Sequence, residues 1–580
     1  MKNTPSIEVD LKGQEATNQI FLSQIDNLPY IKKKDVYQNI EYYLSTGLSV
    51  FLLSYFTTSA GFRSYNFVIN HKLELDLSYL SKYRDYQDLQ WKFFRTNLFI
   101  FSLIGIFFVI VSKLIRKYNN EYFRYFYSIT GICFAFYLIN IRIIYILIPM
   151  LLFFYSSKLV NIGDRNYSIL IWCELLMCKY GITKLEKILE LKNIFKSKNG
   201  IDDLSYEFIT TYALLRMLSF NIEYKKIFYD QTVPESIFSL NQARSHCMEC
   251  FNGNFCSKCL ENAVIAEKDK LENSFDMINF TNYIFYFPLL FNGPLINYNN
   301  FMFQLGIWKD SQHNNLKKMN KVLYFLKLLL LLIIMEVYNH FLFPIFLFRN
   351  GYNTCEPNKG IPLFYYCFIC LNILTFLWLK FAIIWKFGRL LAWCDGIYVE
   401  ENMNRIIYNI YSLEEFFRGM NRSFNRWMVR YLYVPLGGKN KKYVNIWAIF
   451  AFTYFIFNFE NGDYLIYSIC CCILLDIEIF VKYTFINKFG EDYNEKIYLR
   501  YLKYFVGSIY LLILFIVSLI GFHFSLQGMK VIMDNIVANG GHFYLFIFVI
   551  FFFPNIITMF FVRDMELEEC VLLHKKALNY

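Results

Sequence analysis

LEEFFRGMNRSFNRWMVRYLYVPLGG, residues 413–438, places polar and cationic side chains directly between two long apolar segments. Charge at the depth of a membrane is costly, so such residues usually face a water-filled cavity or the protein interior and are retained for function. We expect residues 435–438 to end the helix that carries them. The stretch therefore predicts a buried active site. Its candidate polar residues are Arg418, Asn421, Arg422, Asn425, Arg426 and Arg430.

The composition places this stretch in a membrane protein. Of the 580 residues, 56% are hydrophobic and 21% are aromatic, whereas only 18% are charged. One soluble core cannot bury that much apolar surface, and the apolar runs are long enough to cross a bilayer. The net charge of +11 is modest for this length and is spread over loops beside the apolar runs. It therefore gives no reason to expect nucleic-acid binding.

Apolar runs of about 20 residues recur along the chain and predict an all-α, polytopic membrane bundle. Several runs are short or polar, so we expect roughly ten to twelve transmembrane or re-entrant helices. Two pieces with internal charges, 205–220 and 388–411, are candidates for re-entrant or interfacial segments. No repeat at a fixed period is visible, which disfavours an inverted-repeat transporter. The runs lie near 40–60, 96–115, 122–138, 139–158, 166–182, 205–220, 278–298, 322–348, 361–386, 444–458, 464–482, 500–524 and 543–561.

The chain is predicted to form one membrane domain behind a polar tail. The tail, residues 1–38, contains no short apolar core followed by small residues, so we expect no cleavable signal peptide. Spans joined by short loops normally assemble into one helical unit. We therefore expect residues 39–580 to form a single domain, with a cysteine-rich hydrophilic loop at 222–275.

This loop contains SHCMECFNGNFCSKC, residues 245–259, which holds two C-x-x-C pairs. Each C-x-x-C turn directs two thiolates at one point, so the pairs indicate a structural zinc ion, with disulfides, palmitoylated thiols and unliganded thiols as the alternatives. Four cysteines leave no open ligand position, so zinc would brace the loop rather than catalyse, and would place it in the reducing cytosol. The candidate ligands are Cys247, Cys250, Cys256 and Cys259.

Four blocks of the sequence, in the correct order, resemble the membrane-bound O-acyltransferase superfamily. They are FTNYIFYFPLLFNGPLINYNNFMFQL (280–305), MEVYNH (335–340), WLKFAIIWKFGRLLAWCDGIYVEENMNR (378–405) and SLEEFFRGMNRSFNRWMVRYLYVPLGG (412–438). Within the superfamily, the blocks are most similar to the glycerol uptake protein branch, whose nearest relative is Hedgehog acyltransferase. The resemblance covers a core of about 275–480.

The resemblance implies a helical bundle that encloses a tunnel. A long-chain acyl-CoA would enter from the cytosol as the acyl donor, and a membrane lipid or lipid-anchored acceptor would arrive from the other face. The expected reaction is acyl transfer to a lysolipid hydroxyl, such as that of a glycosylphosphatidylinositol anchor, in the endoplasmic reticulum membrane. Burial of fatty-acid methylenes in such a channel contributes about 0.8 kcal/mol each. The substrate-binding candidates are Arg418, Arg422, Asn425, Arg426 and Arg430.

The family's two catalytic positions also map onto this sequence. The polar position falls on Asn421, whose amide would orient the thioester or instead bridge neighbouring helices. In FTYFIFNFENGDYL, residues 452–465, Phe459 occupies the position of the family's histidine. Two residues are the main candidates for the missing base: Glu460, one residue further on, and His340, which shares a helix face with Glu336. Asp463, His523 and His542 are further alternatives.

Without a base the protein would be a non-catalytic regulator that binds lipid or acyl-CoA on the same fold. The branch name also raises a third function, glycerol transport, although the sequence shows no pore signature or repeat.

Overall fold

The structure is a computed structural model of the whole 580-residue chain. It describes residues 36–70, 76–77, 83–118, 122–158, 164–188, 203–228, 274–291, 293–307, 321–349, 363–403, 405–406, 409–410, 412–458, 462–489, 497–522, 530, 534, 537, 553–563 and 565–566.

The described residues form helices, apart from one short antiparallel ribbon of two strands, β1 (Asp76–Leu77) and β2 (Tyr83–Arg84). The helices of the first half are α2 (Val36–Asn70), α3 (Leu89–Tyr118), α4 (Tyr122–Ile139), η1 (Asn140–Ile143), α5 (Ile144–Ser156), α6 (Asp164–Ile188), α8 (Asp203–Phe228), α13 (Met277–Ile284) and α14 (Phe287–Leu290). The next are α15 (Tyr298–Met302), η3 (Phe303–Ile307), α16 (Lys321–Val337), η4 (Tyr338–Leu342), α17 (Pro344–Arg349), α19 (Leu363–Asp395), α20 (Leu413–Gly419), α21 (Arg422–Met428) and η6 (Val429–Tyr433). The next are η7 (Gly438–Lys441), α22 (Lys442–Asn458), α23 (Gly462–Phe489) and α24 (Ile497–Phe522), and a short apolar helix follows at Phe553–Arg563.

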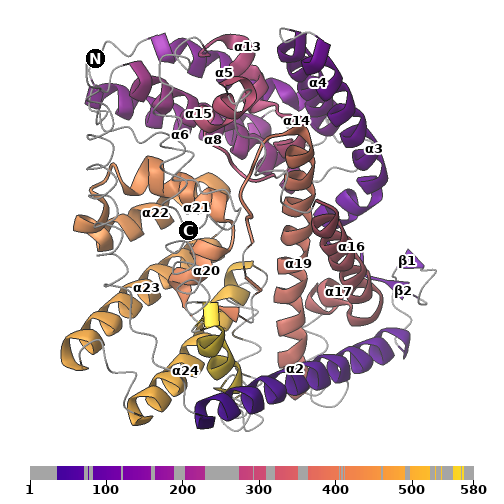
Figure 1. Cartoon of the computed structure of the whole chain (residues 1–580), viewed down its shortest axis with the longest axis vertical. Helices are drawn as coiled ribbons and strands as arrows, with labels where there is room; N and C mark the ends of the chain where they lie inside the picture. The colour runs from indigo at the N-terminus through magenta and orange to yellow at the C-terminus, as the bar shows by residue number, and fades with distance from the viewer. Residues whose placement is uncertain are drawn as a thin grey trace, which may run out of the picture.

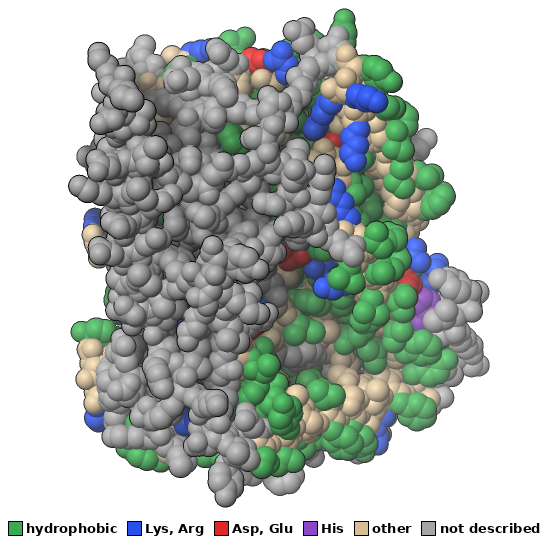
Figure 2. Space-filling view, in the orientation of Figure 1, with side chains coloured by type: hydrophobic (Ala, Val, Ile, Leu, Met, Phe, Trp, Pro, Cys, Tyr) green, Lys and Arg blue, Asp and Glu red, His purple; other side chains and the backbone are tan. Residues whose placement is uncertain are grey.

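Six of these helical segments are long and apolar enough to cross a membrane, counting only the part of the chain that the structure describes. Most of them expose apolar side chains on one side, and Figure 2 shows hydrophobic side chains over much of the described surface on the face it presents. This confirms the predicted all-α, polytopic membrane fold, whereas the enclosed tunnel and the number of spans stay predictions. The six segments are Leu89–Tyr118, Tyr122–Ser156, Lys321–Leu342, Leu371–Asp395, Gly462–Phe485 and Tyr498–Leu519.

Helix α19 is the central element of the arrangement. It stands upright in the middle of Figure 1, with α16 and α17 on one side of it, α20 and α21 on the other, and α2 lying across its lower end. Its window Leu371–Asp395 is 78% buried, whereas only 17% of the window in Lys321–Leu342 is buried. Protein therefore surrounds α19, whereas α16 is largely exposed.

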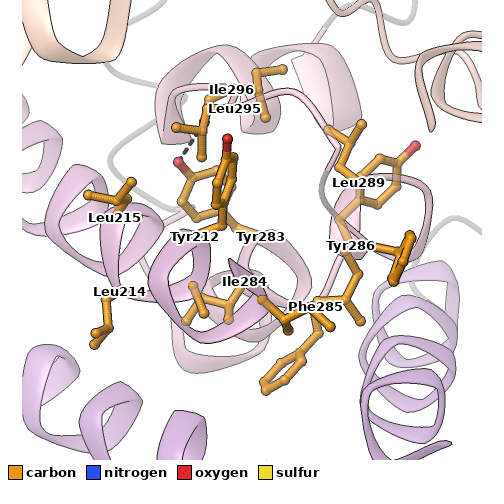
Figure 3. Packing of buried hydrophobic residues seen from close by; sticks show 14 of the residues in the cluster. Tyr212, Leu214, Leu215, Tyr283, Ile284, Phe285, Tyr286, Leu289, Leu295 and Ile296 are labelled. Carbon is orange, nitrogen blue, oxygen red and sulfur yellow. Dashed lines mark hydrogen bonds between the residues drawn. The ribbon is translucent and has the colours of Figure 1, made fainter. Parts of the chain in front are cut away.

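Helix α8 is also buried inside the protein. Its Arg216 binds the backbone where the chain breaks between the short helices α13 and α14. Arg216, which is almost completely buried, donates hydrogen bonds to the carbonyl oxygens of Ile284 and Leu289, each over 2.8 Å. The break between α13 and α14 is therefore bound to α8, and Figure 3 shows Tyr212 of α8 beside Tyr283 of α13. The Tyr283 hydroxyl donates to the Ile296 carbonyl over 2.6 Å. Arg216 of the 205–220 segment thus lies in the protein interior.

Two boundaries of the predicted domain organisation meet described residues. Helix α2 begins at Val36, and the tail before it lies outside the described residues. Helix α8 continues to Phe228, so residues 222–228 of the expected 222–275 loop are helical. Residues 229–273, which hold the four candidate zinc ligands, lie outside the described residues.

Candidate functional site

The charged stretch 413–438 forms two short helices, a π-helical turn and a loop instead of the single helix expected from its sequence. Ser412 caps α20 by accepting a hydrogen bond from the Glu415 N–H, and the carboxylate of Glu478 accepts another from the Leu413 N–H, each over 3.0 Å. The helix then breaks at Asn421, whose φ of 58° lies in the left-handed region that asparagine tolerates better than most residues. The break places the amide of Asn421 between helices.

The amide of Asn421 bridges two other parts of the chain. Its Nδ2 donates to the hydroxyl oxygen of Tyr212 in α8 over 3.0 Å, and its Oδ1 accepts from Nδ2 of Asn402 over 3.1 Å. Burial raises the pKa of Tyr212 to about 12, despite the hydrogen bond from Asn421 and the positive charge of Arg216, so its hydroxyl is neutral at pH 7. The predicted catalytic amide is thus held from both sides by neutral partners.

Asn402 anchors the start of α21 as well. Its side-chain Oδ1 accepts from the Ser423 N–H over 2.8 Å, and its carbonyl oxygen accepts from the Arg422 N–H over 3.1 Å. The hydroxyl oxygen of Ser423 in turn accepts from the Leu295 N–H over 2.9 Å. Three segments from the family-like blocks therefore meet at Asn421.

The end of α22 reaches the same place. The ring of Phe457 lies 6.5 Å from that of Tyr212 and 5.2 Å from that of Phe424, centroid to centroid. Phe459 and Glu460 follow directly in the chain but lie outside the described residues. The segment that leads to them is thus packed beside the tyrosine that binds Asn421.

Three of the predicted substrate-binding arginines form ion pairs with nearby glutamates. Arg426 and Arg422 both face Glu400, the latter with its Nε 3.6 Å from a carboxylate oxygen. Arg418, whose side chain is 70% exposed, pairs with Glu414 one turn earlier, over 2.6 Å. Two cations against one carboxylate leave a positive charge at Glu400, which suits an anionic group such as phosphate.

Arg430 and Asn425 differ from these three. The guanidinium of Arg430 makes a two-pronged ion pair with Glu223 over 2.6 and 3.0 Å. Asn425 is half-buried, and its N–H donates to the Asn421 carbonyl oxygen over 3.1 Å. Arg430 therefore stabilises the join between α8 and the charged stretch.

Glu223 is completely buried, and its carboxylate has a full set of partners. Besides Arg430, it accepts from the hydroxyl of Tyr431 over 2.7 Å and from Nδ2 of Asn299 over 2.6 Å. Burial acts to raise the pKa of Glu223, but the positive charges of Arg430 and Lys226 and these hydrogen bonds outweigh it and lower the pKa to about 2. Glu223 is therefore ionised at pH 7.

His340, the other candidate base, belongs to a separate group of polar residues. Its Nδ1 lies 2.7 Å from the carbonyl oxygen of Glu336, and the Glu336 carboxylate pairs with Arg95. These residues come from α16 and η4, and Figure 1 places α16 on the opposite side of α19 from α20 and α21. The structure therefore does not bring His340 to Asn421.

No cluster of histidine, cysteine or acidic side chains suited to a metal ion occurs in the described part of the chain. The predicted ligands Cys247, Cys250, Cys256 and Cys259 fall in the stretch 229–273, outside that part, so the zinc site stays a prediction.

Comparison with known proteins identifies the family. Residues 200–520 match the family model described as MBOAT, membrane-bound O-acyltransferase family. The match covers more than half of the chain and includes all four blocks of the sequence resemblance. The chain belongs to the membrane-bound O-acyltransferase family.

The curated relatives place this family member in the Gup branch. The membrane-bound O-acyltransferase GUP2 of Saccharomyces cerevisiae is 26% identical over 473 residues, which cover 78% of this chain and 74% of the relative. GUP1 of the same yeast is 25% identical over 84% of both chains. The gup1 protein of Schizosaccharomyces pombe is 29% identical over 62% of this chain and 58% of the relative.

Four residues that build the site of this family member are not predicted from the sequence: Tyr212, Glu223, Asn402 and Glu400. Glu223 carried a usable signal, because a carboxylate directly after the apolar run 205–220 needs a cationic partner once that run is buried. No sequence signal marks the other three residues, Tyr212, Asn402 and Glu400. Tyrosine and asparagine are abundant in this chain, and Glu400 lies in a polar segment that contains no motif of its own.

Proposed function

We propose that this protein is a membrane-bound O-acyltransferase that moves a long acyl chain from acyl-CoA to a lipid hydroxyl. The acceptor in this proposal is a lysolipid, including that of a glycosylphosphatidylinositol anchor, and the membrane is that of the endoplasmic reticulum. Family membership over residues 200–520 supports the reaction class. An integral membrane protein of this family suits a lipid-type acceptor, because both substrates carry long apolar chains.

The observation that carries the proposal is the meeting of Asn421, Tyr212 and the end of α22. Asn421 matches the polar catalytic position of the family, and the segment that leads to the family's second position packs against the tyrosine that binds it. Tyr212 thus contacts both Asn421 and the end of α22, which supports a site shared by the two segments. Such convergence is what a reaction between two bound substrates requires.

The chemical step is the exchange of a thioester for an oxygen ester. The acceptor oxygen attacks the thioester carbonyl carbon, a C–O bond forms, the C–S bond breaks, and CoA leaves as a thiol after it takes up the proton that the hydroxyl loses. In the proposal, the amide of Asn421 orients the thioester or donates to the oxygen on which negative charge develops. The positive charge left at Glu400 by Arg422 and Arg426 attracts the CoA phosphates.

The proton requires a base, and Glu460 is the better of the two candidates. It follows the end of α22 by two residues in sequence, and Phe457 near that end packs against Tyr212, whereas His340 lies across α19 with Glu336. A carboxylate serves as a general base when burial raises its pKa toward neutrality. We therefore assign the base role to Glu460 in this proposal.

The test is an acyl-transfer assay on the purified full-length protein in detergent. Radiolabelled long-chain acyl-CoA and lysophosphatidylinositol are supplied, and labelled phosphatidylinositol and free CoA thiol are measured. We expect turnover in the wild type, none in Asn421→Ala, and at least a tenfold loss in Glu460→Gln. Asn440→Ala, which alters an exposed asparagine of η7, is the matched control and should keep full activity.

The second candidate function is that of a lipid or acyl-CoA binding regulator that performs no chemistry. The replacement of the family's histidine by Phe459 favours it, because phenylalanine cannot accept a proton. Retention of labelled acyl-CoA without any labelled lipid product would support this function over catalysis. Absence of both would contradict the two proposals together.

A structural zinc ion in the cysteine-rich loop is a separate part of the proposal. Cys247, Cys250, Cys256 and Cys259 supply the four thiolates that a closed tetrahedral site needs. Elemental analysis should find one zinc per chain in the wild type and a loss of that zinc in Cys256→Ser/Cys259→Ser. No zinc in the wild type, or equal zinc in both proteins, would contradict the site.

A further inference from the structure

A second group of polar residues, some buried and some half-buried, lies on the side of α19 that carries α16, away from Asn421. We call it the Trp91 cluster, and it comprises Asp88, Trp91, Arg95, Glu336, Asn339 and Lys380. Arg95 pairs with Glu336, and Lys380 pairs with Asp88 over 2.8 Å. Residues from α3, α16, η4 and α19 thus converge here, and charged side chains enclosed in a membrane protein usually pair with one another and serve a function.

Trp91 of α3 and Asn339 of η4 lie at matching positions along the two helical segments that carry the cluster. Arg95 faces Glu336, and Trp91 lies one turn before Arg95 on the same face of α3. Asn339 lies about one turn after Glu336, and its carbonyl oxygen accepts from the N–H of Asp85, a few residues before Trp91, over 2.8 Å. Trp91 and Asn339 therefore lie at the same height along the helices, about one turn closer to β2 than the pair of Arg95 and Glu336.

Both side chains are completely buried with their polar atoms unused. The indole Nε1 of Trp91 and both the Oδ1 and Nδ2 atoms of the Asn339 carboxamide make no hydrogen bond to any residue that the structure describes. Nearly all buried polar groups in proteins have partners, because an unsatisfied one is costly. Two donor nitrogens and one acceptor oxygen thus lie unpaired at the same height along the helices, which indicates that a ligand binds them.

The backbone around Asn339 is also unusual. Residues Tyr338–Leu342 form a π-helical turn, closed by a hydrogen bond from the Phe343 N–H to the Tyr338 carbonyl oxygen over 3.2 Å. Phe343 then takes a φ of 47°, a left-handed conformation that is rare for a bulky residue. π-helical turns occur often at functional sites, and strain of this kind is kept where it positions a side chain.

The charges of the cluster indicate whether its ligand is an ion or an uncharged molecule. Arg95 balances Glu336 and Lys380 balances Asp88, and the neighbouring Asp85 carboxylate is held by the backbone N–H groups of Ile345 and Phe346, so no charged group of the cluster is left to bind an ion. The unpaired atoms of Trp91 and Asn339 include donors and an acceptor. A hydroxyl group can accept a hydrogen bond from such a donor and donate one to the acceptor. We propose that the Trp91 cluster is a binding site, independent of the Asn421 site, for an uncharged ligand that offers O–H groups.

Ordered water and a polyol share this chemistry, and the test separates them. The purified full-length protein in detergent is melted as wild type, Asn339→Leu and Trp91→Phe, with and without increasing myo-inositol as the probe. Trp393→Phe is the matched control, because the Nε1 of Trp393 is also buried without a hydrogen-bond partner among the described residues but lies near Tyr324, at the far end of α19. None of these measurements depends on acyl transfer.

The sign of the change in Tm decides the proposal. A bound ligand loses its partner in Asn339→Leu, so we expect the Tm of this variant to fall by about 2 °C. We also expect the Tm of Trp91→Phe to fall further than that of Trp393→Phe. A saturable rise in Tm with myo-inositol in the wild type alone would identify a polyol. A linear rise shared by all variants is the general effect of an excluded osmolyte, and together with a lower Tm of Asn339→Leu it would leave water as the ligand. An unchanged or higher Tm in Asn339→Leu would overturn the site, because removal of an unsatisfied amide relieves its cost.

Discussion

The Asn421 amide donates a hydrogen bond from Nδ2 to the hydroxyl oxygen of Tyr212, over 3.0 Å, across two segments separated by 209 residues in sequence. Asn402 holds the other end of the same amide, over 3.1 Å. This arrangement fixes the orientation of Asn421, because each end of the carboxamide has a partner of the correct kind. Tyr212 is therefore a positioning residue for the candidate catalytic amide.

Tyr212→Phe removes the hydroxyl that accepts from Asn421 and changes little else. We expect it to lower the kcat for acyl transfer about tenfold, which corresponds to about 1.4 kcal/mol, and to leave the KM for acyl-CoA nearly unchanged. Tyr137→Phe removes an exposed hydrogen bond to Asn97 and serves as the control. A Tyr212→Phe enzyme with wild-type kcat would show that the bond does not position Asn421.

Breaking the ion pair between Glu223 and Arg430 should destabilise the fold. Glu223→Gln leaves the guanidinium of Arg430 beside a buried neutral amide, at a cost of about 3–5 kcal/mol. Glu414→Gln removes the partner of the exposed Arg418 and should cost less than about 1 kcal/mol. Thermal melting of the two variants in the same detergent compares them directly, and equal Tm values would contradict the buried pair's role.

The sequence predicted the class of these elements but not the contacts between them. The apolar runs of α3, α19 and α24 were recognised because a membrane span needs only local hydrophobicity. The partners of Arg430 and Asn421 lie 207 and 209 residues away in α8, and no local pattern encodes such pairs. The break at Asn421 was also missed, since it depends on Asn402 and Ser412 as caps.

Asp85 should make stability depend on pH in the opposite direction from a salt-bridged carboxylate. Burial raises its pKa from 3.8 to about 6, although it accepts hydrogen bonds from the N–H groups of Ile345, Phe346 and Gln87. The folded state thus binds the proton more tightly, so the free energy of unfolding falls by about 3 kcal/mol as the pH rises from about 4 to 6.

Asp85→Asn should remove this dependence. The difference in unfolding free energy between wild type and variant should change between pH 4 and pH 6 and stay constant above pH 7. Melting curves across this range provide the measurement. A difference that is constant from pH 4 to pH 7 would mean that Asp85 titrates normally.

The glycine at position 131 permits α4 to pack against the break between α13 and α14. A Cβ at Gly131 would lie only 2.2 Å from the carbonyl oxygen of Phe285, so Gly131→Ala should cost about 3 kcal/mol or more through backbone displacement. Gly181 in α6 has no atom within 4 Å of such a Cβ, and Gly181→Ala should be neutral or stabilising. Similar Tm values for the two variants would contradict this packing.

The most direct test of the account is a structure of the full-length protein with a non-hydrolysable acyl-CoA, in which a thioether replaces the thioester. We expect the thioether sulfur near Asn421 and the end of α22, with the Asn421 amide or the Tyr212 hydroxyl within about 3.5 Å of the group that replaces the carbonyl. The CoA phosphates should face Arg422 and Arg426. An acyl-CoA bound elsewhere, with no contact to residues 413–438, would contradict the assignment of this stretch as the acyl-transfer site.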